Sequence, residues 1–464
     1  MQWNNGFKIS GAIATSSGIC YFFKKHFNFV RASEFDNNNN VNNNNDDNAG
    51  LNGRSDLKLK HVQVYFRHGA RTPIHVVPSL GEVSYSENDI LGDVTKTLFD
   101  IQVVDLDAGG EPEVSPIQRS YEKRRLKGGG LPGSLTCYGQ EQMFDLGRNM
   151  RQDYASFLPR EFDPDDIYVR STNIHRTIAS LRCVLAGLYG SEELNAKGPI
   201  TIPVSRTQSE ILFPNGHNCP VVRQINHASM IHFDDIPGFK EDRKKLENIL
   251  GIDSEHGSRK LNFIFVRDDI VARVTHGYPM PNIIKPFLDM IEKNAIKMMY
   301  YAFCGQSEAE RKVGLRLTTG LAVGANLDRM EETVQGKRKH KMCLYSTHDS
   351  TLVALLASFD IFDHTWPPFA ADLRLELYED SNGRHWVKVL YCGKEQITRG
   401  NTKVLVPYEE FKENMKPMTI EKKEYDKICK SKILEEIANA LLVHEKDEVE
   451  DEEDKEDSDK PAGM

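Results

Sequence analysis

Three apolar segments that lie far apart in the chain share one layout, and this layout constrains the fold more than any other feature. The segments are HVQVYF (61–66), IYV (167–169) and KMCLYS (341–346), and each leads directly into polar residues. Apolar residues at helical spacing follow the second and third segments. Strands without alternation are typical of sheets that are buried on both faces, in which helices connect parallel strands. The sequence therefore predicts an α/β protein with a mainly parallel sheet and helices on both faces.

Two regions depart from this pattern. Residues 211–320 contain long amphipathic stretches such as FKEDRKKLENILG, which predict a mainly helical cap inserted into the α/β domain. DLRLELYED and HWVKVLYCG alternate on either side of Ser381-Asn382-Gly383, which predicts a hairpin that makes the sheet mixed. We therefore expect an α/β domain formed by residues 57–210 and 321–444, with the cap at 211–320.

The polar residues that follow the three segments are the candidate site residues, because ligands bind beyond the carboxyl ends of parallel strands. They are Arg67, His68 and Arg71 after the first segment, Arg170 after the second, and His348 and Asp349 after the third. Guanidiniums suit phosphate or carboxylate oxygens, and a histidine between them should stay neutral and nucleophilic. Asp349 is the natural candidate to protonate a departing alkoxide, although it could also serve as the N-cap of the following helix. For His348, phosphate binding competes with a hydrogen-bonding role in the core.

The motif Arg67-His68-Gly69-Ala70-Arg71-Thr72-Pro73 resembles the R-H-G-x-R-T-P signature of the histidine acid phosphatases, and His348-Asp349 resembles that family's H-D signature. GSLTCYGQEQ (133–142) and RSTNIHRT (170–177) resemble two further blocks, and the resemblance extends from about Leu57 to Cys429. It implies that His68 attacks phosphorus and becomes a phosphohistidine, while Asp349 protonates the leaving alcohol. It also implies that phosphoryl oxygens are bound by Arg67, Arg71, Arg170 and His348. No metal or other cofactor is implied, because guanidiniums supply the charge stabilisation that Mg²⁺ provides elsewhere.

Within that family, IFDHTWPPFAADL (361–373) and GKEQITRG (393–400) resemble members that act on lysophosphatidic acid. The expected substrate is therefore a small phosphomonoester, lysophosphatidic acid, which would give monoacylglycerol and phosphate. One alternative is a phosphatase of another monoester, such as an inositol polyphosphate, and the other is a catalytically silent binding protein. The cap does contain Lys240, Arg243, Lys244 and Lys245, but acids alternate with them, which favours a solvated helix face over a dense basic rim. Trp366 and Phe369 could contact an acyl chain, but core packing is the simpler interpretation.

The two ends of the chain differ in charge from the rest. Residues 445–460 hold eleven acids against three lysines, so they account for most of the formal net charge of −9, and we expect a disordered acidic tail at 445–464. Bulk charge gives no support for nucleic-acid binding. Residues 1–35 are basic, partly apolar and free of acids before Glu34, which favours a mitochondrial targeting leader over a secretory signal or membrane anchor, with membrane-surface association as a further option. An Asn-rich linker at 36–56 follows.

The eight cysteines form no C-x-x-C pair, which gives a zinc ribbon little support, and their even number permits disulfides.

Overall fold

The structure is a computed structural model, and it describes residues 57–86, 90–252, 254 and 260–430. The leader expected at 1–35, the linker at 36–56 and the acidic tail at 445–464 lie outside these residues. Within the described ranges, no helix is both long enough and apolar enough to cross a membrane.

The strands are β1 (Lys58–Arg67), β2 (Ile101–Asp105), β3 (Ile167–Ser171), β4 (Ile200–Val204), β5 (Met342–Thr347), β6 (Asp372–Glu379), β7 (His385–Tyr391), β8 (Lys394–Gln396) and β9 (Leu405–Pro407). The α-helices are α3 (Pro116–Glu122), α4 (Cys137–Asp153), α5 (His175–Tyr189), α6 (Ser191–Ala196), α7 (Pro220–Ile231), α8 (Phe239–Leu250), α9 (Phe263–Thr275), α10 (Leu288–Cys304), α11 (Glu308–Val334), α12 (Asp349–Ser358), α13 (Tyr408–Met415) and α14 (Lys422–Cys429). Short 3₁₀ helices are η2 (Pro78–Leu80), η3 (Thr95–Thr97), η4 (His232–Asp235), η5 (Asn282–Phe287) and η6 (Lys416–Met418).

One sheet forms the centre of the molecule, in the order β2-β4-β3-β5-β1-β6-β7-β8, with β9 paired to β7. The five strands from β2 to β1 are parallel, whereas β6 and β7 form the expected antiparallel hairpin, which turns through Gly383 at φ 75°. This arrangement confirms the predicted α/β class. The register pairs Arg67 with Thr347 and Ser171 with Ser346, so β1, β3 and β5 end at one level. The polar residues that follow these strands therefore meet at one edge of the sheet.

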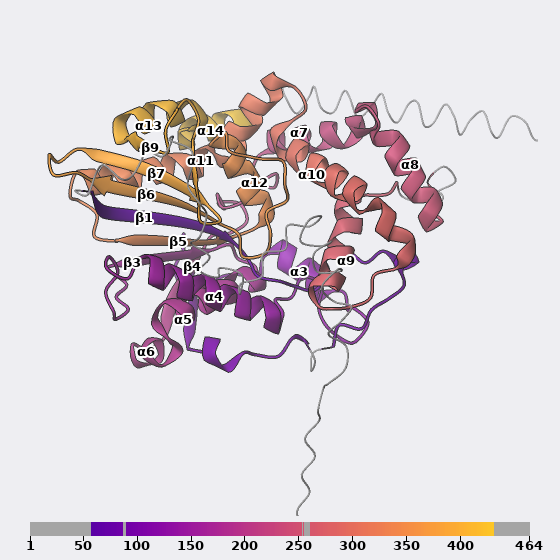
Figure 1. Cartoon of the computed structure of the whole chain (residues 1–464), viewed down its shortest axis with the longest axis horizontal. Helices are drawn as coiled ribbons and strands as arrows, with labels where there is room; N and C mark the ends of the chain where they lie inside the picture. The colour runs from indigo at the N-terminus through magenta and orange to yellow at the C-terminus, as the bar shows by residue number, and fades with distance from the viewer. Residues whose placement is uncertain (1–56, 87–89, 253, 255–259, 431–464) are drawn as a thin grey trace, which may run out of the picture.

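Alternating residues of β1 belong to two separate cores. Val62, Val64 and Phe66 are fully buried in the core that contains α4 and α5. Tyr65 belongs to the core on the opposite face, which contains α11, α12 and α13. Figure 1 shows α4 and α5 below the sheet and α11, α12 and α13 above it. Burial on both faces explains why the β1 segment is apolar without alternation.

The helices α7 to α10 lie to one side of the sheet in Figure 1, and α8, α9 and α10 share a core of their own. This core also contains Val353 of α12 and Trp366, so it is continuous with the α/β domain at that point. Helix α11 begins at a capping box between Ser307 and Glu310 and runs through residue 320, where the sequence placed a domain boundary. A boundary at residue 320 would fall inside this helix. The expected division into an α/β domain and a cap stays a prediction. A disulfide joins Cys219, beside α7, to Cys429 at the end of α14.

Helices α4 and α5 approach each other closely because glycines face each other at their crossing. A Cβ at Gly147 would lie closer to the carbonyl oxygen of Val184 than any real Cβ contact allows, and a Cβ at Gly187 would meet the carbonyl oxygen of Phe144 in the same way. Backbone atoms cannot yield as a flexible side chain can, so the two helices would have to move apart. Because α4 also supports the strand end of β1, this contact positions the candidate site.

We expect Gly147→Ala to lower the free energy of unfolding by about 3 kcal/mol, because overpacking at a helix crossing forces the backbone to shift. Gly324→Ala is the matched control: a Cβ added to this helical glycine on α11 would meet no atom within 4 Å, so alanine should stabilise by up to about 1 kcal/mol through helix propensity. Chemical denaturation of both variants measures the two effects. Equal stability of the two variants would contradict the proposed close packing.

Candidate active site

The chain turns sharply after β1, and glycines at two positions make the turn possible. A Cβ at Gly69 would overlap the backbone of Gly139 in the first turn of α4, and a Cβ at Gly139 would overlap the backbone of Ala70. The turn is further held by the Ala70 N–H, which donates to Oε1 of Gln142 at 2.8 Å. Thr136, the N-cap of α4, accepts from the Gly139 N–H and donates its own backbone N–H to the carbonyl of Ala70. The block that contains Thr136, Gly139 and Gln142 is therefore the support of the turn that carries His68.

His68 is held as a neutral imidazole with one defined tautomer. It is 1% exposed, and its Nδ1 lies 2.8 Å from the carbonyl oxygen of Gly69. Because a carbonyl can only accept, Nδ1 carries the proton and Nε2 keeps a free lone pair. Burial lowers the pKa of His68 well below its ordinary value, and the neighbouring cations Arg176 and Arg67 lower it further. The residue therefore presents an uncharged nucleophilic nitrogen.

Two of the predicted arginines lie in this cluster. Nη2 of Arg67 lies 2.8 Å from Oδ2 of Asp349, its Nη1 donates to the carbonyl of Pro367 at 2.6 Å, and its guanidinium lies 4.2 Å from the ring centre of Phe369. Nη1 of Arg71 lies 2.8 Å from Oδ1 of Asp268. Burial lowers the pKa of Arg67 to about 10, so this guanidinium is still charged at neutral pH. The Nε atoms of both arginines are buried without a protein partner and can donate to a ligand.

The third guanidinium near His68 belongs to Arg176, whereas the sequence pointed to Arg170. Arg176 stands in the first turn of α5, with Nη2 at 3.4 Å from Nδ1 of His348, and its Nε and Nη1 are buried without a protein partner. Arg170 is instead engaged inside the protein, where its Nη2 contacts Glu210 at 2.9 Å and Ser205 at 2.7 Å. It pairs in register with Tyr345, whose side chain belongs to the core on the α11 face. Arg170 therefore points away from the strand end, and the structure does not bring it to His68.

Both arginines occur in the block RSTNIHRT, so the sequence did contain the missed residue. Arg170 precedes the end of its strand, whereas Arg176 follows the strand and begins a helix. In a parallel sheet, ligands bind beyond the carboxyl ends of the strands, and Arg176 is the arginine that stands there. Counting residues from the strand end would therefore have favoured Arg176.

His348 and Asp349 lie where the sequence predicted them, at the junction of β5 and α12. His348 is the N-cap residue of α12, and its Nε2 lies 3.0 Å from the hydroxyl of Thr172. Its ring centre lies 5.7 Å from that of His68. Asp349 is thus the first residue of the helix and not its N-cap, and its Oδ2 accepts from Nε1 of Trp366 at 3.0 Å as well as pairing with Arg67. Burial acts to raise the pKa of Asp349, but the two cations Arg67 and Arg71 outweigh it and hold that pKa below the usual range.

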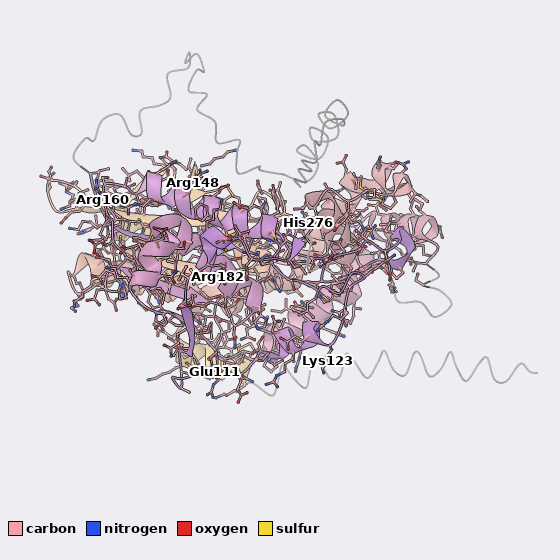
Figure 2. The ribbon with its side chains drawn as sticks, turned by 90° about the horizontal axis from the view of Figure 1, so that it is seen from below. Glu111, Lys123, Arg148, Arg160, Arg182 and His276 are labelled. Carbon is pink, nitrogen blue, oxygen red and sulfur yellow. A yellow bond between two sulfur atoms is a disulfide. The ribbon has the colours of Figure 1, made fainter. Side chains whose placement is uncertain are left out.

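The cap helix α9 adds a carboxylate that the sequence did not indicate. Asp268 pairs with Arg71, and no local motif links these residues because 197 positions separate them. At the end of the same helix, Nε2 of His276 lies 2.9 Å from the hydroxyl of Thr136. Figure 2 shows His276 at the junction between α4 and the cap helices. The cap is therefore in direct contact with the residues that hold the nucleophile.

The geometry suits a tetrahedral oxyanion at phosphorus. The free lone pair of His68 is surrounded by the guanidiniums of Arg67, Arg71 and Arg176, whose unpaired N–H groups can each reach a ligand oxygen. A carboxyl group, Asp349, lies beside this cluster and can exchange a proton with a group that leaves. Such a set combines nucleophilic catalysis, charge stabilisation and general acid catalysis.

The chain was compared with protein families, known sequences and solved structures. Residues 58–392 match the sequence model described as "Histidine phosphatase superfamily (branch 2)". The chain is 36% identical to lysophosphatidic acid phosphatase type 6 of Homo sapiens over 390 residues, which are 83% of this chain and 89% of that protein. It is 25% identical to prostatic acid phosphatase of Mus musculus over 376 residues, which are 78% of this chain and 87% of that protein. A solved structure, the phytase from Citrobacter braakii, superposes with a TM-score of 0.48 at 14% identity, over 78% of this chain and 98% of the phytase.

The depressed pKa of His68 predicts that its imidazole stays neutral at a pH where exposed histidines are protonated, below about 6.5. The unfolded chain would take up this proton and the folded protein would not, so His68 should reduce stability as the pH falls below that value. ¹⁵N NMR of histidine-labelled protein, with His68→Gln to assign the signal, follows the protonation directly. A His68 signal that titrates together with those of exposed histidines would contradict the described environment.

Proposed function

The chain belongs to the histidine phosphatase superfamily (branch 2) and is a phosphomonoester hydrolase, and from this premise we propose that it converts lysophosphatidic acid to monoacylglycerol and phosphate through a phosphohistidine on His68. The resemblance found in the sequence is thereby confirmed at the level of the family. One observation carries the proposed chemistry: a neutral imidazole with a free Nε2 is buried among three guanidiniums, with Asp349 beside them.

In the first step, Nε2 of His68 would form a bond to phosphorus while the bond from phosphorus to the alcohol oxygen breaks. The guanidiniums of Arg67, Arg71 and Arg176 would hold the phosphoryl oxygens, over which negative charge is spread in the transition state. The proton stays on Nδ1, which keeps donating to the Gly69 carbonyl, so the positive charge that develops on the imidazole is stabilised by a fixed hydrogen bond. His348 would lie beside the bound phosphoryl group, with its Nδ1 accepting from Arg176 and so helping to orient that guanidinium.

The leaving alcohol needs a proton, and Asp349 is placed to supply it. In the ligand-free site, Arg67 and Arg71 favour the carboxylate form of Asp349. A bound phosphate brings negative charge onto the same guanidiniums, which weakens their effect and raises the pKa of Asp349 toward a range where it holds a proton. Water would then attack the phosphohistidine, the bond from phosphorus to Nε2 would break, and Asp349 would take the proton of the water. Because Asp349 must begin protonated, activity should fall as the pH rises.

Two considerations favour a lysophospholipid over an inositol polyphosphate. The chain is more than one third identical to a protein named for lysophosphatidic acid, over most of both chains. Of the four cations on helix α8, Arg243 is not available to a polyanion, because it is buried in an ion pair with Asp234. A catalytically silent protein is disfavoured because burying three guanidiniums against two histidines is costly without a ligand that compensates.

We further propose that residues 1–35 direct the protein to the mitochondrion, from their basic and acid-free composition. The disulfide between Cys219 and Cys429 requires an oxidising compartment. Within the mitochondrion, this requirement argues against a strongly reducing compartment. The secretory pathway stays the alternative location.

Purified protein should hydrolyse 1-oleoyl lysophosphatidic acid with a higher kcat/KM than phytate, because the acyl chain adds apolar contact while the site offers charge for one phosphate group. Phosphate release from both substrates under one set of conditions measures this preference. Faster turnover of phytate would remove the lipid assignment and leave the phosphatase assignment intact.

Asp349→Asn should slow alkyl phosphates, whose leaving groups need a proton, by about 100-fold or more, and 4-nitrophenyl phosphate by much less. His68→Ala should abolish turnover of both, and acid quenching with ³²P-labelled substrate should trap label on the wild-type protein and not on this variant. Equal slowing of alkyl and aryl esters by Asp349→Asn would mean that another group donates the proton.

A further inference from the structure

Three consecutive residues of helix α9, in the cap, contact either the candidate active site or the loop that follows its nucleophile. They are Arg267, Asp268 and Asp269, and all three are largely buried. None of them belongs to a motif that the sequence indicated as functional. Their contacts connect the cap to groups that the proposed reaction requires.

Asp268 contacts both Arg71 and the chain that follows it. Its Oδ1 lies 2.8 Å from Nη1 of Arg71, and the pair is almost entirely removed from solvent, with side-chain exposures of 12% and 7%. Its Oδ2 accepts the backbone N–H groups of Ile74 and His75, at 2.6 and 3.0 Å. One carboxylate thus fixes the guanidinium and the loop after it, which restricts both the position and the direction of Arg71.

Arg267 acts on a different residue of the site, because it contacts Trp366, which bonds to Asp349. Its guanidinium lies 4.2 Å from the centre of the Trp366 ring, and two hydrogen bonds to Glu292 of α10, at 2.6 and 3.0 Å, fix its plane. The indole N–H of Trp366 in turn donates to Oδ2 of Asp349 at 3.0 Å. The orientation of Asp349 therefore depends on an indole ring that a cap residue holds in place.

Helix α9 is itself anchored to the α/β domain on both sides of this triplet. Near its start, Phe265 stacks on His75 with ring centres 3.5 Å apart. In its middle, Oδ2 of Asp269 accepts the N–H of Val77 at 2.8 Å. At its end, His276 contacts the hydroxyl of Thr136. A helix with these contacts cannot shift without moving the loop that follows the nucleophile.

We propose that helix α9 is the element through which the cap positions the catalytic groups, with Asp268 as a positioning residue for Arg71 and Arg267, acting through Trp366, as a positioning residue for Asp349. This inference rests on the proposed function, because it assigns Arg71 to phosphate and Asp349 to the leaving group. It predicts that the two residues of one helix affect two separable parts of the reaction.

The first test is Asp268→Asn, which keeps an oxygen for the loop N–H groups but removes the charge that holds Arg71. The kcat/KM for 4-nitrophenyl phosphate and for lysophosphatidic acid should fall by a similar factor, about 10- to 100-fold, because a misplaced guanidinium weakens binding of the shared phosphoryl group. Binding of inorganic phosphate, measured by calorimetry, should weaken as well, and Asp268→Glu should recover part of both losses. Glu241→Gln, an exposed residue of α8, removes the same charge from the cap and should leave both quantities unchanged.

The first test is decided by whether Asp268→Asn binds inorganic phosphate more weakly or more tightly than the wild type. If Asp268 only competed with phosphate for Arg71, its removal would tighten binding of phosphate. Unchanged or tighter binding in Asp268→Asn would overturn the positioning role.

The second test is Arg267→Met, which keeps most of the length of the side chain but loses its plane and charge. Lysophosphatidic acid hydrolysis should slow by about tenfold more than hydrolysis of 4-nitrophenyl phosphate, because only the first needs a correctly placed proton donor. Binding of inorganic phosphate should change little. Arg223→Met, at an exposed position of α7, is the matched control. Equal slowing of the two esters would overturn the role of Arg267.

The outcomes separate this inference from the proposed function. A wild-type protein that does not hydrolyse phosphomonoesters would remove the proposed function, whereas an active wild type with unaffected variants would remove only the inference. Should Asp268→Asn fail to fold, Asp268→Glu and Arg267→Met make the same two comparisons. Thermal unfolding of every variant establishes that it is folded when it is assayed.

Discussion

The burial of like charges around an uncharged histidine is the constraint on which the rest of the structure depends. Three guanidiniums and two imidazoles gather where β1, β3 and β5 end, and they are almost fully removed from water. Placing unpaired charges there would be strongly unfavourable. Two carboxylates compensate part of the charge, Asp349 from helix α12 and Asp268 from helix α9. N–H groups of Arg67, Arg71 and Arg176 remain buried without protein partners, and a bound phosphate would satisfy them.

A cluster of this kind has to be held by rigid supports, because mutual repulsion acts to separate its members. The parallel register of β1, β3 and β5 brings the strand ends together, and the contact between Gly69 and Gly139 places the turn against α4. The contact between α4 and α5 through Gly147 and Gly187 then fixes the helix that carries Arg176. These glycines are thus as necessary to the site as the residues that carry charge.

The sequence predicted those parts of the fold that depend on local pattern. The strands β1, β3 and β5, the helices after the last two, and the hairpin at Asn382-Gly383 were all indicated by apolar runs and turn residues. The strands β2 and β4 were not, because β2 is an edge strand with mostly half-buried residues and β4 alternates between buried and more exposed residues, so neither forms a continuous apolar run. The sequence indicated Arg170 and not Arg176 because the apolar run IYV ends at Val169, two residues before β3 ends. Asp268 was missed for a different reason, since its contact with Arg71 forms only when two distant segments pack, and no periodicity encodes it.

The disulfide between Cys219 and Cys429 joins two points that are 210 residues apart, and its loop encloses α7 to α14 and the strands from β5 onward. Helix α12, which begins with Asp349, and helix α9 both lie within that loop. A single proteolytic cut anywhere between the two cysteines would therefore leave two fragments that remain covalently linked, with the acid–base side of the site still attached to the part of the chain that carries His68. Nicked protein would separate into fragments only after reduction, so a clipped molecule in an oxidising compartment would keep its composition and could retain its assembled site.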